Sequence, residues 1–150
     1  MGASASGVML AALFPKIALS PLAWVALVPL ILVARAAPRP RAAAVYGLLT
    51  GVLFFAVLVE WIRLFDPTGT AWVVATLLEA AFVALFAALV RALSPSPRGW
   101  RGVLVPAAAW TATEWLRALG PLGFTWGGLA YSQHANLALA QVVSLVGTGG

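Results

Sequence analysis

The chain has 150 residues, of which 63% are hydrophobic and 9% are charged, and its mean hydropathy is +1.00. Soluble domains carry roughly 25% charged residues and leave much of their surface in water, so this composition excludes a soluble globular protein and indicates an integral membrane protein. The net charge of +5 does not indicate nucleic-acid binding, because the basic residues stand singly between apolar runs and form no stripe.

The first 34 residues form two apolar segments interrupted by proline, which removes a backbone donor and kinks a helix. We expect short helices at residues 3–15 and 17–34, joined by a tight turn near Lys16. One long bent helix is the alternative. The first segment has no basic region ahead of it and apolar sequence continues beyond it, so we interpret it as a retained membrane segment and not as a signal peptide.

Three further helices are expected at residues 42–63, 71–91 and 102–117, since a membrane span needs about 20 apolar residues. Glycines then punctuate the chain up to Gly128, which predicts a re-entrant or surface loop before a sixth helix at 137–150. The sequence thus predicts an all-α polytopic transmembrane domain of five helices plus the start of a sixth. The abrupt end of the last apolar run suggests a fragment of a longer protein.

The charges predict an orientation in the membrane. The stretches Arg35–Arg41 and Arg91–Arg101 hold six of the nine basic residues. The positive-inside rule places both in the cytoplasm, together with the N-terminus. Lys16 and residues 63–70 and 119–136 then face outward from the plasma (inner) membrane.

Candidate chemistry gathers at this outer face. Glu114 and Arg117 lie three residues apart at the end of an apolar segment and share a helix face. The planar guanidinium of Arg117 could hold a phosphate or carboxylate, and Glu114 could orient it. Aromatic side chains would line an acyl-chain groove beside a polar cluster. The candidate lipid-binding residues are Glu114, Arg117, Phe124, Trp126, Tyr131, Ser132, Gln133 and Trp61.

Several polar and aromatic residues also fit a purely structural role. Tryptophans such as Trp61 form the ordinary aromatic belt of membrane proteins, and Glu60 with Arg63 could be an interfacial ion pair. Glu79, in the middle of a span, is either protonated and bonded to a neighbouring helix or lines a lipid cleft. A lone histidine such as His134 is more often structural. With one His, four scattered carboxylates and no Cys, we expect no metal site and no Cys nucleophile in these residues, and we predict no cofactor.

The stretch Pro106–Gln133 resembles the membrane domain of bacterial apolipoprotein N-acyltransferases. The family's Thr-Glu-aromatic-Leu-Arg helix end matches Thr113–Arg117, and its Gly-Phe-Pro-Trp motif matches Gly123–Trp126 with Thr125 in place of proline. Its Gly-Tyr-Ser-Gln motif matches Ala130–Gln133 with alanine in the first position. Threonine does not fix φ as proline does, so the turn geometry at Thr125 is open.

The resemblance implies a reaction and its partners. Members transfer an acyl chain from a phospholipid donor to the α-amino group of a diacylglyceryl-cysteine on a lipoprotein acceptor, at the outer face of the membrane. Their catalytic Glu, Lys and Cys belong to a nitrilase-like domain that follows the membrane helices, so no catalytic residue transfers to this chain. The resemblance predicts a lipid-facing scaffold.

The sequence leaves two rival functions open. The chain could be a non-catalytic membrane anchor that docks a separately encoded enzyme. It could also be a small transporter, in which case Glu79 is the ionisable residue placed deepest in a span.

Overall fold

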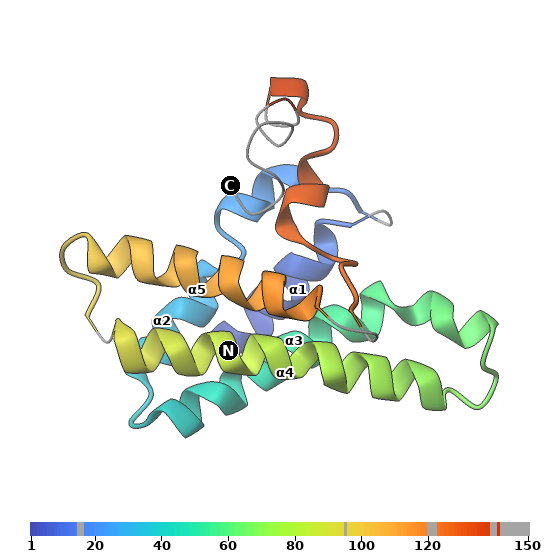
Figure 1. Ribbon diagram of the computed structural model, residues 1–150, viewed down its shortest axis with the longest axis horizontal. Helices are drawn as coiled ribbons and strands as arrows, with labels where there is room; N and C mark the ends of the chain where they lie inside the picture. The colour runs from blue at the N-terminus through green and yellow to red at the C-terminus, as the bar shows by residue number, and fades with distance from the viewer. Residues whose placement is uncertain (15–16, 95, 120–122, 139–140, 142–150) are drawn as a thin grey trace.

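The computed structural model describes residues 1–14, 17–94, 96–119, 123–138 and 141. Within these ranges the chain is all-helical and contains no strand, as the sequence predicts (Figure 1). The α-helices are α1 (Gly2–Ala12), α2 (Val28–Ala36), α3 (Pro40–Leu58), α4 (Thr70–Leu93) and α5 (Arg101–Arg117), and the 3-10 helices are η1 (Ser20–Trp24), η2 (Glu60–Leu64) and η3 (Leu129–Gln133). The expected sixth helix at 137–150 falls almost wholly outside the described residues, as does Lys16.

In the described part of the chain, two helices are long and apolar enough to cross a membrane. These are α3 with 19 residues and α4 with 24, which correspond to lengths of about 28 and 36 Å. Both expose large apolar side chains, among them Val45 and Leu49 on α3 and Val74 and Leu77 on α4. Exposed apolar surface on a long helix favours contact with lipid.

Prolines set several of the boundaries. Residues 17–34 divide into η1, which has Pro21 in its first turn, and α2, which has Pro29 in its first turn. Proline is accepted there because the first turn of a helix has no intrahelical partner for its N–H groups. α3 also starts on a proline, Pro40, and it ends at Leu58, so that Glu60 and Arg63 lie in η2 and not in a helix that continues to residue 63.

Small residues bring α3 and α4 together along most of their length. A Cβ atom on Gly51 would lie 2.6 Å from the Cα of Ala80, and one on Gly47 would collide with the carbonyl oxygen of Val83. The two backbones therefore approach more closely than any larger side chain at these positions would permit.

Polar side chains on α1 and α3 satisfy backbone groups inside the bundle. The Ser6 hydroxyl on α1 accepts a hydrogen bond of 2.8 Å from the Leu30 N–H in the first turn of α2. Thr50 on α3 donates to the Ala3 carbonyl at 2.9 Å. Both side chains are fully buried. Each hydrogen bond therefore supplies a partner to a backbone group that water cannot reach.

The loops gather at two ends of α3, α4 and α5. Arg35 and Arg91 hydrogen-bond across the α2–α3 and α4–α5 connections, which lie together at the left of Figure 1. At the opposite end, the rings of Trp61 in η2 and Trp126 lie 5.8 Å apart. The residues expected to share a membrane face on grounds of charge therefore also share an end of the bundle.

Candidate functional site

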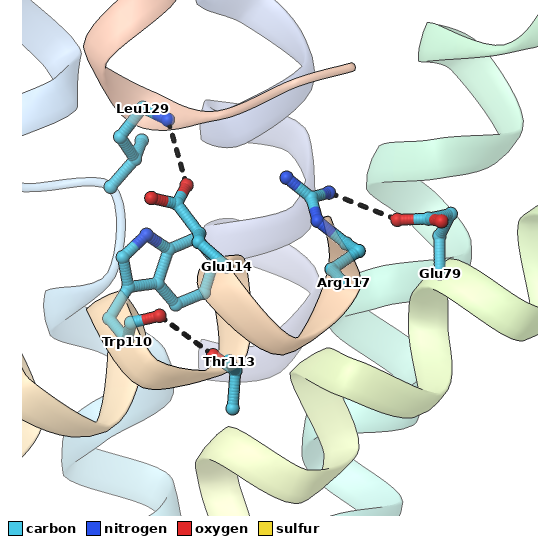
Figure 2. A network of polar contacts seen from close by, with 6 residues as sticks. All are labelled: Glu79, Trp110, Thr113, Glu114, Arg117 and Leu129. Atoms are coloured by element: carbon cyan, nitrogen blue, oxygen red, sulfur yellow. Dashed lines mark hydrogen bonds and ion pairs between the residues drawn. The ribbon is translucent and has the colours of Figure 1, made fainter. Parts of the chain in front are cut away.

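The α5 helix end carries a buried ion pair. Arg117 donates a hydrogen bond of 3.1 Å from Nη1 to Oε2 of Glu79 on α4 (Figure 2). The two side chains are only 6% and 2% exposed. The Arg117 guanidinium also lies 5.2 Å from the ring centre of Phe55. The bond between Glu79 and a neighbouring helix was one of the two interpretations of this residue, but its partner is a cation, which that interpretation did not include.

The sequence did not reveal this pair. The partners lie 38 residues apart on different helices, and only spacing within a helix can be read from sequence. A signal nevertheless existed: a carboxylate in the middle of a span needs a cation or a hydrogen-bond donor. Arg117 is one of the few basic residues assigned to the end of the bundle away from the two arginine-rich loops.

Glu114 has a different partner. Its Oε1 accepts a hydrogen bond of 2.9 Å from the Leu129 N–H at the start of η3, as Figure 2 shows. One turn later, the Arg117 carbonyl accepts a 2.9 Å bond from the Phe124 N–H. The last turn of α5 thus holds both ends of the segment Phe124–Leu129, and this contact is the clearest role that the structure gives Glu114.

Gly127 fixes how this segment lies on the bundle. Its φ is +83°, a conformation that favours glycine. A Cβ atom there would collide with Cδ2 of Leu58 and lie 3.1 Å from Phe54, both on α3. The absence of a side chain at Gly127 therefore lets the backbone of this segment pack directly against α3.

Three of the candidate aromatic side chains come together. Trp126 packs between Trp61, at 5.8 Å, and Phe124, at 6.4 Å between ring centres. Trp61 and Trp126 are 41% and 55% exposed, so large parts of both rings face outward. Tyr131 is 47% exposed and lies on η3.

The remaining candidates make internal bonds. Ser132 is buried and donates to the Leu129 carbonyl at 2.7 Å. The Gln133 amide donates to the Ser20 carbonyl at 2.8 Å and so ties η3 to η1. His134 lies within 3.2 Å of the Tyr131 carbonyl, which is a local contact of the kind expected for a structural histidine.

Cavities surround the segment from Phe124 to Gln133. One of about 590 Å³ is lined by Glu114, Arg117, Thr125 and Tyr131. A second of about 620 Å³ lies between Phe14, Trp61 and Trp126. A third of about 550 Å³ is bounded by Phe14, Trp126, Tyr131 and Ser132. All of the candidate residues except Phe124 and Gln133 line one of these three spaces.

The walls of these cavities decide what they could hold. They are mainly apolar and aromatic, and the charged groups at the first cavity are the α5 residues Glu114 and Arg117. Among the described residues, no acceptor reaches the buried Nε of Arg117. The described parts of the chain also contain no group of three or more His, Cys, Asp or Glu side chains that could hold a metal ion. This arrangement suits hydrocarbon chains with a polar group at one end.

Comparison with known proteins identifies the family. Residues 6–150 match the apolipoprotein N-acyltransferase N-terminal domain. The apolipoprotein N-acyltransferase of Geobacter metallireducens is 34% identical over 97% of this chain, and that of Gloeobacter violaceus is 35% identical over 84%. The one from Nitrosomonas europaea is 30% identical over the whole chain.

The matches cover only part of these relatives. The chain spans 29% of the Geobacter protein, 26% of the Gloeobacter protein and 32% of the Nitrosomonas protein. The resemblance carried by Pro106–Gln133 is thus confirmed across nearly the entire sequence: the chain belongs to the apolipoprotein N-acyltransferase family and corresponds to its N-terminal domain.

Proposed function

We propose that this chain is the membrane domain of an apolipoprotein N-acyltransferase and that it holds acyl chains for the transfer reaction. The donor is a phospholipid, and the acceptor is the N-terminal diacylglyceryl-cysteine of a lipoprotein. The nucleophile, a cysteine that carries the acyl group as a thioester, is not among these residues, since the chain has no cysteine.

The observation that carries this proposal is the pair of cavities that share Trp126. Together they join the rings of Trp61, Trp126 and Phe14 into one largely apolar surface beside η2 and η3, and Glu60 and Arg63 also line the 620 Å³ cavity. Their volumes of about 620 and 550 Å³ are within the range of small-molecule sites. Aromatic and aliphatic walls favour hydrocarbon, because each methylene removed from water contributes about 0.8 kcal/mol.

The polar groups of α5 have a positioning role in this proposal. Glu114 and the Arg117 carbonyl hold the segment that carries Phe124 and Trp126. The Arg117 guanidinium is held by Glu79, and Arg117 lines the 590 Å³ cavity together with Glu114, which gives the polar end of a bound lipid two charged neighbours. In the proposed orientation this end of the bundle faces outward and the arginine-rich loops face the cytoplasm.

Two observations bear on the rival functions. A transporter requires a polar pathway, and Glu79 is 2% exposed and bonded to Arg117. A simple anchor needs no cavities lined by Trp61 and Trp126. The first observation favours a substrate-holding domain over a transporter, and the second favours it over a simple anchor.

The test is acyl transfer by the full-length protein with a fluorescent lipopeptide acceptor. We expect Trp126→Ala to raise the KM for phospholipid about tenfold with little change in kcat, because it removes ground-state contacts with the chain. Tyr46→Ala, an exposed aromatic residue of α3 outside these three cavities, should leave both constants unchanged. Equal effects of the two substitutions would refute the proposal.

A second comparison tests the positioning role of Glu114. Glu114→Gln keeps an oxygen that can accept from the Leu129 N–H, whereas Glu114→Ala leaves that donor without a partner. We expect the glutamine variant to retain transfer activity and the alanine variant to lose most of it. Arg117→Ala should weaken transfer without removing the protein from the membrane. Wild-type activity of either alanine variant would exclude the role assigned to that residue.

A further inference from the structure

The two arginine-rich loops form one surface although they are far apart in the sequence. Arg35 donates from Nε to the Ser94 carbonyl at 3.0 Å and from Nη2 to the Ser94 hydroxyl at 3.1 Å. It also bonds to the Gly102 carbonyl. Arg91 donates from Nε to the Ala37 carbonyl at 2.6 Å. These bonds join the connections at the left end of the bundle in Figure 1.

Arg35 and Arg91 are occupied by these carbonyls, but four other arginines are not buried. Arg39, Arg41, Arg98 and Arg101 are all exposed at this end. Neither Arg35–Arg41 nor Arg91–Arg101 contains Asp or Glu. The four carboxylates of the chain lie elsewhere: Glu60 and Asp66 belong to the opposite end, and Glu79 and Glu114 bond to Arg117 and Leu129. Within the part of the chain that the structure describes, acidic side chains therefore do not neutralise the positive charge of this surface.

Helix dipoles add to this charge. α3 and α5 both begin here, and among the described residues no side chain caps either N-terminus. At the other end, Asp66 accepts a 2.7 Å bond from the Ala71 N–H at the start of α4. The N-terminus of a helix favours anions. At the basic end, an anion from outside the chain can therefore take the place that Asp66 occupies at the start of α4.

Trp100 marks the depth of this surface. Its side chain is 67% exposed, and the Arg101 guanidinium lies 5.4 Å from its ring centre. Exposed tryptophans beside basic residues are typical of the headgroup level of a bilayer. We use the term basic surface for Arg39, Arg41, Arg98, Arg101 and Trp100.

We propose that the basic surface binds the headgroups of acidic phospholipids in the leaflet that it faces. The planar guanidinium of arginine can bind two phosphate oxygens at once. Four exposed arginines close together give a higher local positive charge than single arginines that snorkel to the interface. Each basic residue near an anionic membrane surface strengthens binding to that surface by about fivefold. This interaction is separate from acyl transfer and does not depend on the substrate cavities at the other end.

The experiment places the full-length protein in phosphatidylcholine nanodiscs that contain a small fraction of a brominated lipid. That lipid is either phosphatidylglycerol or phosphatidylcholine, with bromine near the headgroup end of its chains. Bromine quenches nearby tryptophan, and the difference between the protein and its Trp100→Phe variant isolates the signal of Trp100. We expect brominated phosphatidylglycerol to quench Trp100 at least about fivefold more effectively than brominated phosphatidylcholine, and high salt to reduce the difference.

Matched variants separate charge from folding. Replacing Arg39, Arg41, Arg98 and Arg101 together by glutamine should abolish the preference, and single replacements should reduce it in steps. Replacement of the same four residues by lysine should retain most of it. Arg63→Gln, at the opposite end, should have no effect. Equal quenching by the two lipids, or a preference that survives the fourfold glutamine replacement, would overturn the proposal, and so would displacement of the lipid by a soluble oligonucleotide.

Discussion

Arg117 and Glu79 join α5 to α4 through a 3.1 Å hydrogen bond in a region from which nearly all solvent is excluded. Removing one member of such a pair leaves the other as an unpaired buried charge, which costs about 3–5 kcal/mol, whereas replacing both by apolar residues is often neutral. The pair is therefore best examined through variants that remove one or both charges.

We expect Glu79→Leu and Arg117→Met each to lower the free energy of unfolding by about 3 kcal/mol or more. The double variant should lose less than the sum of the two. Reversible unfolding in mixed detergent micelles measures the three values. Arg63→Met is the control, because this exposed arginine lies over the face of Trp72 near the surface, and its loss should cost less than about 1 kcal/mol. Strict additivity at positions 79 and 117 would mean that the pair contributes nothing.

Gly127 offers a test of why the aromatic segment lies where it does. Gly127→Ala should destabilise the domain for two reasons: the positive φ costs about 1 kcal/mol, and the new Cβ meets Leu58. Gly69→Ala has a similar φ of +73° but nothing within 4 Å of the added atom, so it should show the first cost alone. The difference in melting temperature between the two variants reports the collision with α3. Identical shifts would show that the segment moves aside without cost.

Asp66 predicts a dependence on acid. Hydrogen bonds from the Thr68 hydroxyl and the Ala71 N–H lower the pKa of this carboxyl below its ordinary value. A depressed pKa in the folded state means that the ionised group adds stability above the unfolded pKa of about 4, and that this contribution is lost as the pH falls through the folded value. Melting temperatures measured from neutral pH to below about pH 4 should therefore fall more for the natural protein than for Asp66→Asn. Thr68→Val should reduce the difference, and parallel curves for the protein and Asp66→Asn would exclude this role.

The orientation in the membrane can be tested with single cysteines. Ser96→Cys and Thr68→Cys place a thiol at exposed positions at opposite ends of the bundle. In intact cells that express the full-length protein without other exposed cysteines, we expect an impermeant maleimide to label the Thr68→Cys variant. The Ser96→Cys variant should resist labelling until the cells are opened. The opposite pattern would reverse the proposed topology.

Local features of the sequence predicted much of the helical architecture. Long apolar runs identified α3 and α4, and Pro21 and Pro29 indicated that the first third of the chain is interrupted. These features are local, and composition and backbone chemistry are enough to find them. The sequence also predicted that the two arginine-rich loops lie on the same side of the membrane. The positive-inside rule needs only the charge of each loop and no knowledge of contacts between them.

Contacts between residues far apart in the chain could not be predicted from the sequence. Glu114 was expected to orient Arg117, since the two share a helix face, but its carboxylate accepts a hydrogen bond from Leu129, and Arg117 bonds to Glu79. Ser132 and Gln133, which were predicted to bind lipid, donate hydrogen bonds to the backbone carbonyls of Leu129 and Ser20, and Ser132 also lines the 550 Å³ cavity. Side chains of these types bind ligands and backbone with the same atoms, and only the packing of the loop decides which.

Trp126 and Phe14 stand between neighbouring hollows and face into both. A change in the rotamer of either ring therefore alters the shape of both hollows at once. If both hollows hold hydrocarbon chains, as proposed, the length of chain that fits one depends on the chain that occupies the other.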